Sequence, residues 1–209
     1  QGYLDGASMA ATFNSLRSND LIWYFVINNY LMGKKPPVFD LLYWNSDSTR
    51  FPAQLLLDYL RNMYQHNKLS QPGGFTLLGE SVDLGNIKIP TYIQAGKEDH
   101  VAPAESVFKA VNLYGGPVKF MLAGSGHISG VINPPAANKY HHWTNAKKKT
   151  YNELEDWFAD AKQHHGSWWG DWNKWLSKKS GDKVTARVPG DGKLKIIEAA
   201  PGNYVKVRS

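Results

Sequence analysis

A strand–helix–strand pattern in the middle of the chain is the feature that most constrains its fold. Residues 87–95 form an apolar run that ends at Gly96, and residues 118–123 form a second run. Between them, residues 103–114 carry apolar side chains at helical spacing and stop at Gly115. Two strands joined by a helix over about 35 residues are typical of a parallel, right-handed crossover unit. The sequence therefore predicts an α/β fold.

Helices are predicted before this unit. Residues 8–16, 21–32 and 52–67 have helical periodicity, with Asp20 as N-cap and Gly33 as C-cap of the second helix. A short apolar segment, residues 39–45, interrupts them, and a short strand is predicted at residues 75–78. We expect residues 1–70 to form a helical subdomain and residues 71–209 to hold the α/β core with terminal helices.

The last third of the chain returns to helical periodicity. Thr150 and Glu153 match a capping box, which predicts a helix directly after them. Trp168, Trp172 and Trp175 recur at helical spacing in the next segment. Residues 180–209 are rich in Gly and Pro, and a hairpin is predicted around residues 190–192.

Composition excludes several classes of protein. The 209 residues include no cysteine, so this chain has neither a disulfide nor a cysteine nucleophile of its own. The longest apolar run, residues 21–27, is far shorter than the ~20 residues of a membrane-spanning helix. The net charge is +6, but cationic and acidic residues alternate along most of the chain. That pattern favours a solvated surface over a nucleic-acid site.

The ends of the two predicted parallel strands carry the candidate functional residues. Asp99 follows the first strand, and His127 lies in a Gly-rich loop after the second. Loops at the carboxyl ends of such strands hold reacting groups in open α/β sheets, and adjacent strands bring them side by side. The catalytic triad of α/β-hydrolases runs in the order nucleophile, acid, histidine. Asp99 and His127 match the last two, the acid fixing the imidazole tautomer and the histidine accepting a proton.

These residues also have structural interpretations. Asp99 is close enough to the predicted helix to be its cap, Glu98 could replace it as the acid, and a histidine in a Gly-rich loop is often only exposed. No Gly-x-Ser-x-Gly elbow is present, and Ser8, in the nearest similar string, is predicted to be helical. The histidine pairs at 141–142 and 164–165 are adjacent residues that diverge on a helix, so no metal site is predicted. The tryptophans between 157 and 175 suit a sugar-binding platform, but their spacing favours a core.

Seven segments together resemble one known family. They are residues 2–6 (GYLDG), 39–45 (FDLLYWN), 97–103 (KEDHVAP), 126–135 (GHISGVINPP), 142–145 (HWTN), 164–169 (HHGSWW) and 200–206 (APGNYVK). Over nearly its whole length the chain resembles the catalytic region of class I polyhydroxyalkanoate synthases, the bacterial enzymes that polymerise 3-hydroxyacyl-CoA into storage polyester. The segment at 126–135 is the most specific of the seven.

This resemblance implies the C-terminal part of an α/β-hydrolase fold, with residues 1–70 as a helical cap or lid. It implies a Cys-His-Asp triad in which Asp99 and His127 are the acid and the base and the cysteine lies outside this chain. The substrates would be 3-hydroxyacyl-CoA and the growing polyester chain, with no cofactor and no metal. His127 would activate the thiol and then the 3-hydroxyl group, and Asp99 would support it or serve the hydroxyl itself. The family also implies a homodimer in the cytoplasm at the surface of polyester granules.

Two other functions are compatible with the same residues. An α/β-hydrolase-type esterase or polyester depolymerase would use the same Asp and His with water as the acceptor. Alternatively, the chain alone is an inactive fragment or a structural subunit, because it lacks a nucleophile. A sheet of two or three strands leaves unpaired edges, so we expect residues outside this chain to complete it.

Overall fold

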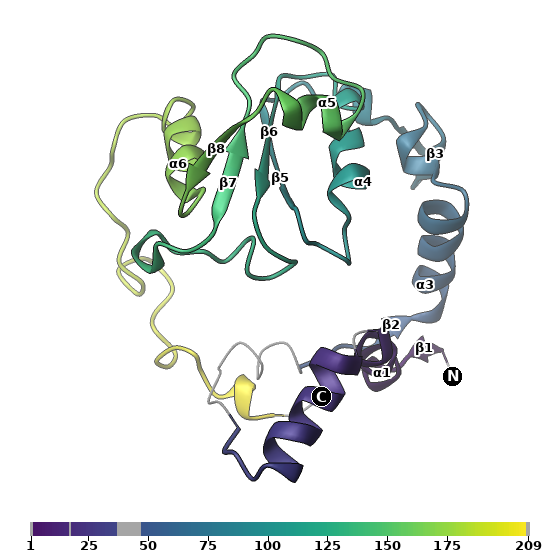
Figure 1. Ribbon diagram of the computed structural model, residues 1–209, viewed down its shortest axis with the longest axis vertical. Helices are drawn as coiled ribbons and strands as arrows, with labels where there is room; N and C mark the ends of the chain where they lie inside the picture. The colour runs from purple at the N-terminus through teal and green to yellow at the C-terminus, as the bar shows by residue number, and fades with distance from the viewer. Residues whose placement is uncertain (1, 17, 37–46, 208–209) are drawn as a thin grey trace. The chain divides into compact units, whose positions relative to one another are not determined.

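The computed structural model describes residues 2–16, 18–36 and 47–207. The chain forms two compact units, Gln1–His66 together with Thr185–Ser209, and Asn67–Val184 (Figure 1). The mixed helix and strand content agrees with the predicted α/β class. None of the helices in the described residues is long and apolar enough to cross a membrane. The assignment of residues 1–70 as a cap and 71–209 as a core stays a prediction.

The first unit consists mainly of short helices. The two-residue strands β1 (Tyr3–Leu4) and β2 (Phe51–Pro52) pair antiparallel. Its helices are α1 (Gly6–Leu16), η1 (Asn19–Trp23), η2 (Val26–Leu31), α3 (Ala53–Tyr59), η3 (Leu60–Gln65) and, near the C-terminus, η8 (Tyr204–Lys206). Segments η1, η2 and η3 have the wider π-helical hydrogen bonding, which is uncommon over runs of this length.

The helices predicted in this unit are confirmed, but two local predictions are wrong. Asp20 lies inside the first turn of η1 and does not precede the helix as an N-cap. Gly33 does end the second helix, with a φ of 62° that suits glycine. Around residue 190 the chain forms a turn closed by Asp191 N–H donating to the Val188 carbonyl, and the described residues 178–207 contain no hairpin strand. The predicted apolar segment 39–45 lies outside the described residues.

The second unit contains a four-stranded sheet in the order β5–β6–β7–β8. Strands β5 (Thr91–Gly96) and β6 (Val118–Ala123) are parallel, whereas β7 (His141–Thr144) and β8 (Lys162–His165) each pair antiparallel with the preceding strand. Before the sheet, η4 (Lys68–Ser70), the hairpin β3 (Phe75–Leu77) and β4 (Glu80–Val82), and η5 (Leu84–Asn86) follow one another. The remaining helices are α4 (Ala104–Phe108), η6 (Lys109–Asn112), η7 (Pro135–Ala137), α5 (Leu154–Ala159) and α6 (Trp169–Ser177).

Alternation along β6 divides the core into two layers. Phe120 and Leu122 face one side, where they pack with residues of α4 and α5 such as Phe108 and Trp157. Met121 and Ala123 face the other side, where they pack with Trp168 at the start of α6. Because successive strand residues point to opposite faces, one apolar strand is buried on both sides. The sheet thus has helices over both faces (Figure 1).

The central crossover prediction is confirmed, and the last third of the chain is corrected. Strands β7 and β8 were not predicted, and the paired histidines, which were treated as helical when a metal site was considered, lie on these strands. The predicted capping box is wrong because the N-cap of α5 is Glu153, which makes no side-chain cap bond, and Thr150 lies upstream of the cap. The helix carrying Trp172 and Trp175 is confirmed as α6.

Candidate active site

The carboxyl ends of β5 and β6 place Asp99 and His127 in direct contact. His127 Nδ1 lies 2.9 Å from Asp99 Oδ2. The Asp99 side chain is only 9% exposed, whereas the imidazole is 49% exposed. A carboxylate only accepts hydrogen bonds, so Nδ1 carries the proton and Nε2 of the neutral ring is an acceptor. Within the part of the chain that the structure describes, no residue makes a hydrogen bond with Nε2.

Asp99 is held by the backbone that follows it. Its second oxygen, Oδ1, accepts hydrogen bonds from the N–H groups of Val101 and Ala102, each at 2.9 Å. Burial alone would raise the pKa of Asp99, but the Ala102 N–H, the His127 ring and the Val101 N–H outweigh it and lower that pKa. Asp99 therefore caps the turn before α4 and bonds His127 at the same time, so the structural and functional interpretations are compatible. Glu98 is exposed and does not replace it.

Backbone hydrogen bonds join the two loops that carry these side chains. Lys97 N–H donates to the Ala123 carbonyl at 2.7 Å and Glu98 N–H to the Ser125 carbonyl at 3.1 Å, which extends the parallel pairing past both strand ends. A Cβ on Gly96 would lie 3.0 Å from the Ser125 carbonyl oxygen and 3.2 Å from Asp99 Cβ. The close approach of the loops therefore depends on glycine at this position.

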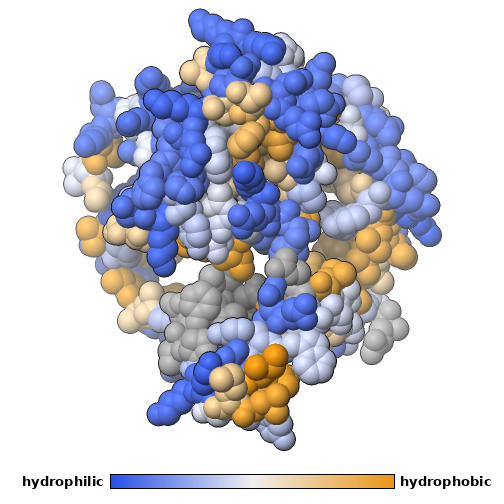
Figure 2. All heavy atoms as spheres, viewed as in Figure 1, coloured by the Kyte–Doolittle hydropathy of each residue, from blue (hydrophilic) through white to orange (hydrophobic). Residues whose placement is uncertain are grey.

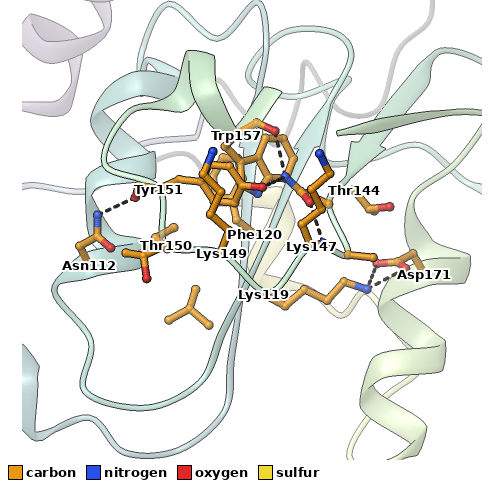
Figure 3. Close-up of a pocket in the computed structure, with 14 residues that line it drawn as sticks. Asn112, Lys119, Phe120, Thr144, Lys147, Lys149, Thr150, Tyr151, Trp157 and Asp171 are labelled. Atoms are coloured by element: carbon orange, nitrogen blue, oxygen red, sulfur yellow. Dashed lines mark hydrogen bonds and ion pairs between the residues drawn. The ribbon is translucent and has the colours of Figure 1, made fainter. Parts of the chain in front are cut away.

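Two hollows in this unit lie close to the sheet, and neither is lined by Asp99 or His127. The larger, about 560 Å³, is lined by the start of β6, the end of β7 and the segment leading to α5, including Phe120, Tyr151 and Trp157 (Figure 3). Since the loops that carry Asp99 and His127 follow the ends of β5 and β6, this hollow lies at the opposite end of the sheet. Its lysines are already paired, Lys119 with Asp171 and Lys147 with Asp160. A smaller hollow of about 200 Å³ adjoins the candidate site and is lined by Glu98, Ser125 and His141, among others.

The structure also bears on the predictions about a metal site at the histidine pairs and about Ser8 as a nucleophile. His141 lies opposite His165 across β7 and β8, and His142 lies opposite His164. The two pairs lie on opposite faces of the sheet. Among the described residues, no group of three or more His, Cys, Asp or Glu side chains could hold a metal ion. Ser8 lies within α1, as predicted, and not on a nucleophile elbow.

Comparison with known proteins gives one consistent result. The chain is 52% identical over 208 residues to the poly(3-hydroxyalkanoate) polymerase subunit PhaC of Rhizobium meliloti, covering all of this chain and 33% of that protein. It is 48% identical over 209 residues to the poly(3-hydroxyalkanoate) polymerase of Methylorubrum extorquens, and 45% identical over 207 residues to the subunit PhaC of Cupriavidus necator. The chain is homologous to the C-terminal third of poly(3-hydroxyalkanoate) polymerases.

This homology confirms the resemblance predicted from the sequence. The chain spans about a third of the length of the curated polymerases it matches. No protein-family model matches it. The match extends over the whole chain, and therefore includes the two loops that carry Asp99 and His127.

Sequence reasoning did not assign any role in the site to Trp168 and Trp169. Their indole N–H groups donate to the carbonyls of Gly130 and Val131, at 2.8 and 3.0 Å, in the loop that follows His127. Trp168 is buried, which agrees with the interpretation of the tryptophans as core residues. The only signal in the sequence was the adjacency of two tryptophans after Gly166, and it does not specify which carbonyls they reach.

Proposed function

We propose that this chain supplies the acid and the base of an acyltransferase that polymerises 3-hydroxyacyl groups from CoA thioesters. The observation that carries the proposal is the hydrogen bond between the Asp99 side chain, which is 9% exposed, and the exposed imidazole of His127 at the ends of two parallel strands. The match to polymerases along the whole chain supports this substrate class. The arrangement supports the predicted α/β-hydrolase fold, in which acid and histidine occupy such loops.

The nucleophile in this proposal is a cysteine outside this chain. His127 Nε2 accepts the thiol proton, and the thiolate attacks the carbonyl carbon of the CoA thioester. The tetrahedral intermediate collapses, CoA leaves as a thiolate, and the imidazolium returns the proton to it. The acyl group is then bonded to the cysteine sulfur as a new thioester. Asp99 stabilises the imidazolium in both steps without taking up the proton.

Chain growth requires a second base step. A 3-hydroxyl group attacks the carbonyl of a thioester, its proton passes to His127 Nε2, an ester bond forms and the departing sulfur takes the proton. Asp99 is poorly suited to act on the hydroxyl directly. Both of its oxygens already accept hydrogen bonds, its side chain is 9% exposed, and its pKa is lowered. These contacts favour His127 as the base for the thiol and for the hydroxyl.

The open edge of the sheet supports the prediction that further chain completes this core. Among the described strands, β5 pairs only with β6 and so stands at one edge. We propose that residues outside this chain, including the cysteine segment, pair along β5, since the edge of a parallel strand pair is seldom left unpaired. A homodimer, a cytoplasmic location at granule surfaces, and the absence of a cofactor remain proposals.

Substitution of the two side chains in the complete protein tests this function. We expect His127→Gln to lower the rate of CoA release from 3-hydroxyacyl-CoA by roughly 10²- to 10⁴-fold, because the general base is lost. Asp99→Asn should cause a loss of similar order, because the amide no longer fixes the required tautomer. Circular dichroism should show that both variants fold.

His100→Gln is the matched control, since His100 is an exposed imidazole in the same loop as Asp99. It should keep normal activity. Near-normal turnover by either His127→Gln or Asp99→Asn would reject its role. The product distinguishes the two enzyme classes: CoA release with polymer formation supports synthesis, and CoA release with free 3-hydroxy acid supports a hydrolase.

A further inference from the structure

The loop that carries His127 is attached to the fold on both sides of the imidazole. Upstream, it leaves the buried end of β6, and the Ser125 carbonyl accepts a hydrogen bond from Glu98 N–H. Downstream, Gly130 N–H donates to the Gly126 carbonyl at 2.8 Å and closes a turn around His127. A Cβ on Gly130 would lie 2.7 Å from that same carbonyl oxygen, so the turn is tightly closed. The position of His127 therefore depends on what holds Gly130.

Gly130 is held by a tryptophan from a distant part of the chain. The Gly130 carbonyl accepts a hydrogen bond from Trp168 Nε1 at 2.8 Å, and the next carbonyl, of Val131, accepts one from Trp169 Nε1 at 3.0 Å. Two consecutive indole N–H groups thus bind two consecutive peptide carbonyls. Gly130 and Trp168 are both buried, so water does not readily replace this bond.

The indole of Trp168 is itself fixed by the sheet. Its ring stacks against Tyr92 of β5, with ring centroids 6.2 Å apart, and it packs on Met121 and Ala123 of β6. The turn before it is bonded to β7, since Gly166 N–H donates to the Tyr140 carbonyl and His142 Nδ1 bonds the Gly166 carbonyl. Strand β7 and the residue before it thereby help to position the start of α6, from which both indoles reach the His127 loop.

We propose that Trp168, assisted by Trp169, is a positioning residue for His127. The inference rests on the proposed function, because it assigns these indoles a role in the reaction only if His127 is the base. Neither indole contacts the imidazole in any hydrogen bond of the described residues; each acts through the loop backbone. Loss of the Trp168 bond frees the Gly130 carbonyl, loosens the turn around His127 and weakens the Asp99–His127 hydrogen bond.

The test compares Trp168→Phe with Trp172→Phe in the complete protein. Phenylalanine keeps an apolar ring but removes the N–H donor. Trp172 lies on α6, which begins directly after Trp168, and the two ring centroids are 6.0 Å apart. The Trp172 indole donates no hydrogen bond to a described residue. Because misplacement of a catalytic group by about 1 Å can cost 10²-fold, we expect Trp168→Phe to lower kcat by roughly 10- to 100-fold at unchanged KM. Trp172→Phe should keep kcat within about twofold of the parent, since it leaves both carbonyl bonds in place.

A spectroscopic measurement tests the positioning without any turnover. The Nδ1 proton in the Asp99–His127 bond should give a low-field one-dimensional proton NMR signal, assigned by its absence in His127→Gln. Trp168→Phe should weaken or abolish this signal, and Trp172→Phe should keep it. If His127→Gln retains activity, the proposed function fails, yet this signal still decides whether Trp168 positions the ring.

Trp169→Phe covers the case in which Trp168→Phe does not fold, because Trp169 is less buried. It should fold normally and lower kcat about threefold at unchanged KM, since one of the two carbonyl bonds is lost. The inference is overturned if a folded Trp168→Phe keeps both kcat and the low-field signal, or if Trp172→Phe loses them equally. With Trp168→Phe unfolded, an unchanged kcat in Trp169→Phe also overturns it.

Discussion

Among the described residues, only the second unit of the molecule buries a cluster of large apolar side chains. In the second unit, aromatic and aliphatic residues such as Phe108, Phe120 and Met121 are almost completely buried. In the described part of the first unit, only Gly6 is buried, and Tyr30 and Leu31 on η2 are 84% and 68% exposed. Figure 2 shows apolar atoms gathered at the surface where η1 and η2 lie, at the bottom of the view.

The difference follows from the presence of a sheet. Alternating side chains give β6 two faces, and each face offers a flat surface that helices can cover. Short helices and two-residue strands in the first unit offer no such surface, so its apolar residues stay in contact with solvent. Exposed apolar clusters of this kind mark surfaces that bind something else. Stability should therefore come mainly from the second unit, and interaction mainly from the first.

Removing one aromatic ring from each unit is the most direct test of this difference in burial. Phe108→Ala should destabilise the protein by about 3–5 kcal/mol, because it leaves a cavity between Phe120 and Trp157. Tyr30→Ala should change the free energy of unfolding by less than about 0.5 kcal/mol, since the ring is exposed. Urea unfolding followed by tryptophan fluorescence measures both. Equal losses would show that the two units contribute alike.

A smaller effect is expected from acidification, through His142 in the second unit. Burial is the main reason why the pKa of His142 is lowered, and repulsion from His164 and Lys119 adds to it. The hydrogen bond to Gly166 and the charge of Asp171 raise this pKa but do not outweigh burial. The unfolded chain then binds a proton that the folded chain does not, so stability falls as the pH drops from about 6.5 through the folded-state value. Measured free energies of unfolding at pH 7.5 and 5.5 should differ in the parent protein. His142→Gln should reduce that difference, whereas an unchanged difference would assign the effect to another group.

The smallest effect should come from a polar substitution on the exposed helices. Leu31→Gln should leave the free energy of unfolding within about 0.5 kcal/mol, because Leu31 is 68% exposed. The same variant should self-associate less, as sedimentation velocity would show, if η2 takes part in the proposed dimer. A loss of more than about 1 kcal/mol would mean that Leu31 belongs to a packed interior and that the two units differ less than described.

The crossover unit and the Asp99–His127 pair could be predicted from sequence because their signals are local. Gly96 marks the end of the strand, and Gly115 marks the end of the helical segment. Two adjacent parallel strands bring the loops that follow them together, whatever the rest of the fold. The choice of Asp99 over Glu98 was left open in the sequence. In the structure Asp99 bonds His127, and two backbone N–H groups in the turn before α4 hold its carboxylate.

Strands β7 and β8 escaped prediction because they are four residues long and hold polar side chains without alternation. Their pairing depends on contacts between segments about twenty residues apart, which periodicity does not report. The hydrogen bonds from Trp168 and Trp169 could not be predicted for the same reason. Helical spacing placed Trp172 and Trp175 on α6 correctly, but the partners of the indoles at its start come from a loop 38 residues earlier.

The single hydrogen atom that Gly96 carries in place of a side chain has a consequence for how such a site can vary. Even one methyl group there would push against the peptide oxygen of Ser125 and the base of the Asp99 side chain. The two loops would have to separate by a few tenths of an ångström, and a hydrogen bond of 2.9 Å has little room to lengthen. Residues elsewhere along these loops have more freedom to change, whereas the spacing between Asp99 and His127 is limited by the smallest residue, at the end of β5.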